Sequence, residues 1–130
     1  MPSIFTKIIQ NEIPAFKVAE TSEFLAFLDI RPLTKGHTLC IPKTEIDNIF
    51  DLDDETFAGL HLFSKIVANA IKKTISCNRV GVCVMGLEVP HAHIHLIPFN
   101  DLNEMNFSND KLQLSDEEMK LIATEIAANL

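Results

Sequence analysis

The sequence predicts a single α+β domain, in which a meandering antiparallel sheet of about five strands carries one long helix on a face. Three observations predict this fold class. Short runs of β-branched and aromatic residues are separated by polar or proline-containing turns, and apolar residues recur at helical spacing between residues 54 and 74. No repeat or linker divides the 130 residues, of which 47% are apolar, so one compact core is expected.

Each element follows from local signals in the sequence. A short first helix ends before Ile13-Pro14, because a residue that precedes proline avoids helical geometry. The long helix follows an acidic run and ends near Lys72-Lys73, which suits its dipole. A last helix opens with the capping box Ser115-Asp116-Glu117-Glu118. The helices are expected over residues 4–10, about 54–74 and 115–128, and the strands over residues 16–20, 24–29, 37–41, 79–85 and 91–98.

Residues 1–130 are expected to form one domain, with its core in residues 4–98 and a C-terminal extension in residues 99–130. The polar, asparagine-rich stretch 99–114 is expected to cross the surface. An antiparallel sheet that is covered on one face leaves its other face free to carry a site. The functional side chains are therefore expected on the face opposite the long helix.

Charge and composition exclude several classes of partner. Eleven basic and eighteen acidic residues give a net charge of −7 without a basic stripe, so no nucleic-acid polymer is expected as a partner. Imidazoles and backbone N–H groups can still hold a small phosphate ligand. The chain starts without a secretory signal and no apolar run could span a bilayer, so a cytoplasmic protein with no membrane partner is expected. Cys40, Cys77 and Cys83 form no Cys-x-x-Cys pair, which suits reduced thiols in the cytosol.

Three of the five histidines alternate with apolar residues in one short stretch. In a strand, Ala92, Ile94 and Leu96 would point to one face and His91, His93 and His95 to the other. Neighbouring histidines would lie roughly 6–7 Å apart, a spacing that suits an extended, charged ligand. His37 follows Gly36 at the start of another strand and could join the same face, whereas His61 is expected to be structural or exposed.

Three interpretations of this row compete. The first is a solvent-exposed strand face, which strict alternation disfavours. The second is a metal site, but His91 and His95 would be about 13 Å apart, so one ion could take only adjacent members. The third is phosphorus chemistry, in which one imidazole attacks phosphorus while its neighbours bind oxygens and manage protons. The third interpretation is favoured.

The stretch His91-Ala92-His93-Ile94-His95-Leu96-Ile97-Pro98 resembles the signature of the histidine triad (HIT) superfamily, and the chain is most similar to its Hint-type branch. The resemblance covers approximately residues 4–98. Its other parts are Ile4-Phe5-Thr6-Lys7-Ile8-Ile9, Glu12-Ile13-Pro14-Ala15, Lys17-Val18-Ala19-Glu20, Phe24-Leu25-Ala26-Phe27-Leu28-Asp29-Ile30-Arg31-Pro32 and Gly36-His37-Thr38-Leu39-Cys40-Ile41-Pro42-Lys43.

The resemblance implies a catalytic role for each histidine of the row. His93 would be the nucleophile that attacks the α-phosphorus of a purine nucleotide and forms a nucleotidyl-histidine. His95 would bind a phosphate oxygen and assist the leaving group, and His91 and His37 would form a hydrogen-bonded relay. Water would then release a nucleoside monophosphate, without a metal or another cofactor.

The resemblance also implies a nucleotide site and a partner. Asp29 would hold the ribose hydroxyls, with Ile30 and Phe27 near the base. Members of the family are usually homodimers joined through the long helix and a strand, so a homodimer is expected.

The chain departs from the family pattern in two places. Leu87 stands where a glutamine is expected and Glu88 where a hydroxyl residue is common, and the family's upstream asparagine has no counterpart. Leu87 cannot donate a hydrogen bond to a phosphate oxygen, and an ionised Glu88 would repel one. Either turnover is weaker for these reasons, or Glu88 is protonated and donates its proton to the leaving group. Ser3 and Thr6 stand where members with a structural zinc carry cysteines, so no metal site is expected.

The sequence therefore predicts a purine nucleotide hydrolase that cleaves a nucleoside phosphoramidate. Dinucleoside polyphosphate hydrolysis is the alternative within this class. A non-catalytic nucleotide sensor is a second class, favoured by the altered Gly86-Leu87-Glu88 loop, and a metal-binding protein is a third. The residues do not distinguish adenine from guanine or name the leaving group.

Overall fold

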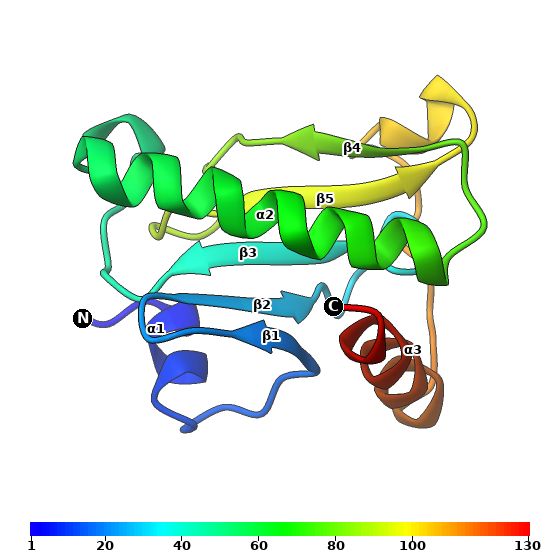
Figure 1. The fold of residues 1–130 in the computed structure, drawn as a ribbon, viewed down its shortest axis with the longest axis horizontal. Coiled ribbons are helices and arrows are strands. Elements are labelled where there is room, and N and C mark those ends of the chain that lie inside the picture. Colours follow the sequence, from blue (N-terminus) through cyan, green and yellow to red (C-terminus); the bar gives the residue numbers. More distant parts are fainter.

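The fold is built on one five-stranded sheet in the order β1-β2-β3-β5-β4, and every neighbouring pair of strands is antiparallel (Figure 1). The computed structural model describes all residues, 1–130. The strands are β1 (Lys17–Glu20), β2 (Phe24–Leu28), β3 (Thr38–Pro42), β4 (Arg79–Cys83) and β5 (Ile94–Phe99). The helices are α1 (Ile4–Ile9), α2 (Asp54–Thr74) and α3 (Asp116–Ala128), with short 3₁₀ helices η1 (Ile49–Asp51) and η2 (Leu102–Met105). This confirms the predicted α+β class.

The sheet is a meander only over its first three strands. The chain leaves β3 through α2, forms β4 at the edge, and returns as β5 between β3 and β4. The prediction of a continuous meander is therefore wrong for the second half. The physical reason lies in burial, because β5 is buried at all but its last residue whereas β4 is partly exposed throughout. The more apolar strand takes the central position.

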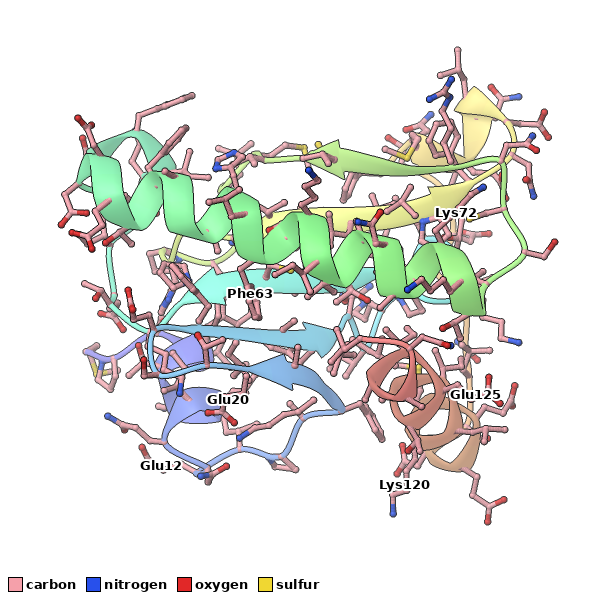
Figure 2. All side chains as sticks on the ribbon, in the orientation of Figure 1. Glu12, Glu20, Phe63, Lys72, Lys120 and Glu125 are labelled. Carbon is pink, nitrogen blue, oxygen red and sulfur yellow. The ribbon has the colours of Figure 1, made fainter.

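The long helix α2 covers one face of the sheet, as predicted. Asp53 caps it by accepting a hydrogen bond from the Thr56 amide, at 2.7 Å. The ring of Phe63 points from α2 toward the strands and stacks on Phe24, with ring centroids 5.5 Å apart (Figure 2). Helix α3 opens with the predicted capping box and adds four buried side chains to the same core: Met119, Ile122, Ala123 and Ile126. The C-terminal extension is thus part of the main core.

The opposite face of the sheet is not free over β2 and β3, contrary to expectation. All residues of these two strands are buried, because α1 packs against that face. Phe5 and Ile8 of α1 form a second apolar cluster with Leu25, Phe27, Leu39 and Ile41. The N-terminal segment and the sheet therefore make two walls, and the site described below lies between them.

The last strand begins three residues later than predicted. The Ala92 amide donates to the Ile46 carbonyl at 2.7 Å and the His91 amide to the Val89 carbonyl at 2.8 Å, so these residues bond outside the sheet. The β4 strand likewise ends at Cys83, before a turn in which Gly86 has a φ of 77°. None of the helices combines the length and the apolar character that a membrane span requires.

Candidate active site

The histidine row lies on the face of the sheet that helix α1 covers. Ala92, Ile94 and Leu96 are buried in the main core under α2, as alternation predicts. Phe5 of α1 contacts the rings of His91 and His93 on the opposite side, with centroids 5.8 and 5.1 Å away. The rings of His93 and His95 are 5.0 Å apart. Only His95 lies within β5, so the hydrogen bonds of the other two histidines must hold them in place.

His91 is fully buried and anchors the N-terminal segment. Its Nε2 lies 2.8 Å from the Pro42 carbonyl oxygen and its Nδ1 lies 2.8 Å from the Ser3 hydroxyl. A carbonyl only accepts, so the ring proton is on Nε2 and Nδ1 accepts from Ser3. Burial lowers the pKa of His91, which keeps the ring neutral.

His93 presents a free lone pair. Its Nδ1 lies 2.7 Å from the backbone carbonyl oxygen of His91, so this nitrogen carries the proton. The Nε2 of the neutral ring is then unprotonated. An imidazole nitrogen in this state is a nucleophile near neutral pH.

His95 presents an N–H group in place of a lone pair, because a hydrogen bond from His37 fixes its tautomer. The Leu33 amide donates to His37 Nδ1 at 3.0 Å, so His37 carries its proton on Nε2. This Nε2–H donates to His95 Nδ1 at 2.9 Å, which leaves the proton of His95 on its own Nε2. Burial lowers the pKa of His37 to about 3 and that of His95 to about 4, so both rings are neutral at pH 7.

Two separate chains of hydrogen bonds therefore orient the site. His37 bonds to His95, whereas His91 bonds to Ser3 and Pro42. The expected relay between His91 and His37 is wrong: each anchors a different part of the site. The result is a lone pair on His93 beside an N–H group on His95.

A cavity of about 200 Å³ opens between the N-terminal segment and the sheet. Its polar side chains are those of Asp29, Glu88, His93 and His95. Its other walls are apolar and come from Ile4, Phe5, Ile8, Ile13, Pro14, Ala15, Phe27, Leu28, Ile30, Leu39 and Val89. The cavity thus brings together six of the eight expected site residues, while His91 and His37 lie behind it as supports.

Asp29 is the partly buried carboxylate of this cavity, just after the end of β2. One oxygen accepts a hydrogen bond from the Arg31 amide at 2.9 Å, and the other lies 3.7 Å from His37 Nε2. Burial raises the pKa of Asp29, and the nearby carboxylate of Glu88 raises it further. The side chain is well placed to accept hydrogen bonds from a polar ligand.

The model of the HIT domain matches residues 10–102. The chain belongs to the HIT family. An uncharacterized HIT-like protein of Borreliella burgdorferi is 37% identical, over 98% of this chain and 97% of that protein. Adenosine 5'-monophosphoramidase hnt1 of Schizosaccharomyces pombe is 35% identical, over 100% of this chain and 99% of that protein. The crystal structure of a Hit-like protein from Bartonella henselae has a TM-score of 0.85 at 32% identity, covering 98% of this chain and 96% of that one.

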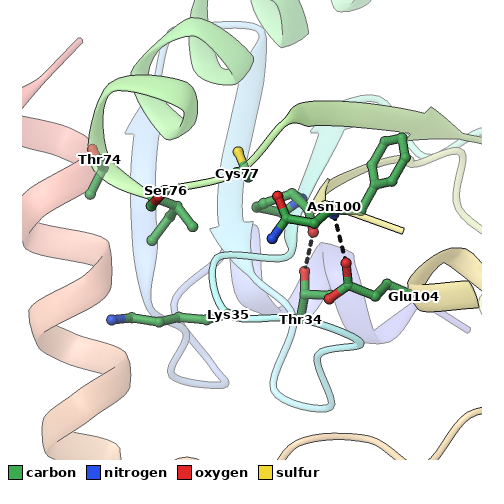
Figure 3. Close-up of a pocket in the computed structure, with 10 residues that line it drawn as sticks. Thr34, Lys35, Thr74, Ser76, Cys77, Asn100 and Glu104 are labelled. Atoms are coloured by element: carbon green, nitrogen blue, oxygen red, sulfur yellow. Dashed lines mark hydrogen bonds between the residues drawn. The ribbon is translucent and has the colours of Figure 1, made fainter. Parts of the chain in front are cut away.

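A second cavity of this HIT-family chain is larger than the one beside His93 and His95, and none of the histidines lines it. This cavity has a volume of about 440 Å³ and is lined by Pro98 and Phe99 at the carboxyl end of β5. Figure 3 shows its lining residues. Two hydrogen bonds join groups of its lining: the Thr34 hydroxyl donates to the Pro98 carbonyl at 2.6 Å, and the Asn100 amide donates to Glu104 at 2.6 Å. Volume alone therefore does not mark the site.

The donor atoms of the HIT-family site favour hydrogen bonding over metal ligation. Asp29, His37 and His95 each offer one atom, all within 4.8 Å of one another. However, the bond from the Leu33 amide keeps the proton on His37 Nε2, so this nitrogen has no lone pair for an ion. The Ser3 hydroxyl bonds to His91, and the Thr6 hydroxyl donates to Glu45. Hydroxyl groups are poor zinc ligands.

Sequence reasoning missed the supports of this HIT-family site. The N-terminal segment was expected to be only a short helix, yet six of its side chains line the cavity. In the sequence, Ser3 and Thr6 stand out only as replacements for cysteines, whereas in the structure they bond to Glu45 and His91. The signal that could have found them is a pair of hydroxyl residues one helical turn apart, before an apolar helix.

Proposed function

We propose that the protein hydrolyses a purine nucleotide conjugate, such as a nucleoside phosphoramidate, and releases a nucleoside monophosphate. One observation carries the proposal: His93 offers a lone pair beside the N–H of His95, with the ring centroids 5.0 Å apart. A phosphorus centre needs both groups, because the nucleophile attacks it while an N–H stabilises its oxygens. The name of the fission yeast relative, an adenosine 5'-monophosphoramidase, supports this substrate class.

The nucleoside occupies the cavity between the N-terminal segment and the sheet. Asp29 accepts hydrogen bonds from the ribose hydroxyls, while Phe27 and Ile30 contact the base. Apolar walls with one buried carboxylate suit this division, since a purine has two flat apolar faces and a ribose has two donors.

The reaction proceeds in two displacements at phosphorus. His93 Nε2 attacks the α-phosphorus, the P–N bond of the phosphoramidate breaks, and the leaving amine takes up a proton. Water then attacks the phosphorus of the nucleotidyl-His93 and gives a proton back to the group that protonated the amine. The P–Nε2 bond breaks, and the nucleoside monophosphate leaves with the water oxygen. Substituted His93 is cationic, and the His91 carbonyl that accepts its Nδ1–H at 2.7 Å stabilises this charge.

Glu88 donates the proton to the leaving group in this proposal. Its side chain lines the cavity with both reacting histidines, and it stands where the family uses a hydroxyl residue. Replacing Glu88 by Gln is expected to slow turnover of poor leaving groups about 100-fold and of good ones far less. Equal rates for Glu88→Gln and the wild type on both kinds of substrate would remove Glu88 from the mechanism.

Trapping the covalent intermediate tests the proposed function. Acid quenching of the wild type during turnover of an adenosine phosphoramidate should give protein that carries one nucleotidyl group, located on His93 by peptide mass spectrometry. His93→Ala should bind the nucleotide but form no adduct. Turnover by His93→Ala at the wild-type rate would contradict the proposal, as would turnover without an adduct in a rapid-quench burst.

Leu87 favours a second candidate, a nucleotide sensor without fast chemistry. The side chain is 93% exposed and can donate no hydrogen bond to a phosphate oxygen. Tight binding of AMP without turnover of phosphoramidates or dinucleoside polyphosphates would select the sensor. Faster turnover of a dinucleoside polyphosphate would select the alternative hydrolase, whose leaving group is a phosphate.

The proposal includes a homodimer in the cytoplasm. The exposed side of α2 carries Leu62 and Ile66, which are 63% and 58% exposed, and β4 at the sheet edge carries Val82, which is 60% exposed. Apolar side chains beside an unpaired strand edge suit contact with a second copy. The three cysteines are free thiols, which suits a reducing compartment.

A further inference from the structure

We propose that Phe107 is a positioning residue that shields the hydrogen bond between His37 and His95 from water. Phe107 lies outside the residues 10–102 that match the HIT domain, in the stretch that the sequence suggests is a surface crossing. The inference deepens the proposed function and rests on it for the role of His95. It assigns part of the site to the C-terminal segment of this chain.

The ring of Phe107 lies against both imidazoles. Its centroid is 5.0 Å from that of His95 and 6.2 Å from that of His37, and it is nearly perpendicular to each, at 76° and 84°. The two histidines are only 8% and 1% exposed. An aromatic ring at this distance occupies the space that water would otherwise take beside the pair.

A set of hydrogen bonds holds Phe107 in this position. Lys111 Nζ donates to the Phe107 carbonyl at 2.6 Å and to the Asn109 carbonyl at 2.9 Å. The Asn109 side chain donates to the Asn103 carbonyl at 2.6 Å, and the Leu112 amide donates to the Pro32 carbonyl at 2.8 Å. The segment is thus fixed both to itself and to the loop that precedes His37.

The pair needs such a cover because its function depends on both rings being neutral. If His95 gained a second proton, its Nδ1 would become a donor and could no longer accept from His37. Access of water stabilises a charged imidazole, and so does the Asp29 carboxylate, which lies 3.7 Å from His37 Nε2. The other charged or titratable groups that face the pair are His93, Glu88 and Lys111, and the Lys111 ammonium opposes protonation of His37.

Three variants test the inference in the full chain. Phe107→Ala removes the ring, Phe107→Leu keeps an apolar cover, and Leu102→Ala is the matched control. Leu102 is an exposed apolar residue of the same segment, 82% exposed, and is in neither apolar core cluster. Far-UV circular dichroism checks that each variant is folded.

The first readout is the titration of His95, followed by long-range ¹H–¹⁵N NMR without substrate. In Phe107→Ala the midpoint should rise by roughly 1 pH unit or more, with Phe107→Leu close to the wild type and Leu102→Ala unchanged. The second readout is the pH profile of kcat, whose acid limb should move up by the same amount while KM changes less than about twofold. An unchanged titration in folded Phe107→Ala would overturn the inference.

The two readouts separate this inference from the proposed function. A shifted titration in a protein that turns over no nucleotide conjugate would keep the role of Phe107 and refute the hydrolase. If the protein is an active hydrolase and Phe107→Ala changes neither the titration of His95 nor the pH profile of kcat, the proposed function stands and the role of Phe107 is refuted.

Discussion

At the scale of single residues, the state of each histidine follows from what its other nitrogen touches. His93 has a carbonyl at Nδ1 and so keeps a lone pair at Nε2, whereas His95 has a donor at Nδ1 and so keeps a proton at Nε2. The two rings have the same chemistry and opposite roles. The His91 carbonyl and the Leu33 amide make this difference, and a backbone group leaves no signal in the residue type.

His37→Phe should separate the hydrogen-bonding role of His37 from its packing role. Phenylalanine fills the space but leaves His95 Nδ1 without a donor, so the proton of His95 is no longer held on Nε2. We expect kcat to fall roughly 100-fold with a smaller change in KM, measured by steady-state kinetics on a phosphoramidate. His61→Phe on α2 is the matched control, because His61 bonds only to the Phe57 carbonyl. A His37→Phe enzyme as fast as His61→Phe would contradict the assigned tautomers.

The buried histidines should also make stability depend on pH in a definite direction. The pKa values of His37, about 3, and His95, about 4, lie below the ordinary value, and that of His91 is lowered too. Below about pH 6.5 the unfolded chain therefore binds protons that the folded chain does not, so stability is full above this pH and is lost as the pH falls toward 4. Asp29, whose pKa is raised, offsets part of the loss at the acid end of this window.

Urea unfolding at pH 7, 6 and 5 measures this dependence. The free energy of unfolding should decrease at each step, by on the order of 4 kcal/mol in all, since His37 and His95 each contribute about 2 kcal/mol. A free energy that is constant or rises between pH 7 and pH 5 would show that the histidines are not buried as neutral rings.

At the scale of elements, the N-terminal segment is fastened by a cluster of hydrogen bonds around Glu45. The Glu45 carboxylate accepts from the Ser3 amide at 2.6 Å and from the Thr6 hydroxyl at 2.6 Å, and Ser3 bonds to His91 at 2.8 Å. These bonds lower the pKa of Glu45. Helix α1 has only six residues, too few to be stable alone, so the cluster holds the wall of the cavity in place.

Glu45→Ala should therefore weaken nucleotide binding rather than the chemical step. Loss of both bonds frees Ser3 and Thr6, so we expect KM to rise about fivefold while kcat stays within about twofold, with a lower Tm. Glu45→Gln keeps one acceptor oxygen and should lie between Glu45→Ala and the wild type. Glu12→Ala removes the same charge at a position of the N-terminal segment itself and is the control. A KM for Glu45→Ala equal to that of Glu12→Ala would refute this role.

The elements differ in how well the sequence predicts them. The bounds of α2 could be predicted to the residue, because Asp53, the acidic first turn and Lys72-Lys73 are local signals. The start of β5 could not, because the bond between Ala92 and Ile46 joins residues far apart in sequence. The same holds for the cavity: alternation predicts that the histidines share a side, but only the folded chain brings α1 over them.

At the scale of the whole molecule, the edge strand β4 has no second partner strand, and one side of α2 is exposed. Ile66 lies on the exposed side of α2, and the β4 edge lies beyond β5. Ile66→Glu should give a monomer in sedimentation velocity, since a charge is costly in an apolar interface. Leu121→Glu on α3, at a site that is 59% exposed, is the control and should remain dimeric. A wild type that sediments as a monomer at all concentrations would refute the homodimer.

The proposed chemistry depends most directly on the opposite protonation of two neighbouring rings. Long-range ¹H–¹⁵N NMR of the ligand-free protein at pH 7 reads the protonation of each histidine nitrogen. We predict that His93 carries a proton on Nδ1 and a lone pair on Nε2, and that His95 is neutral with its proton on Nε2. A protonated Nε2 on His93, or a charged His95, would contradict the assignment of nucleophile and donor on which the proposed function rests.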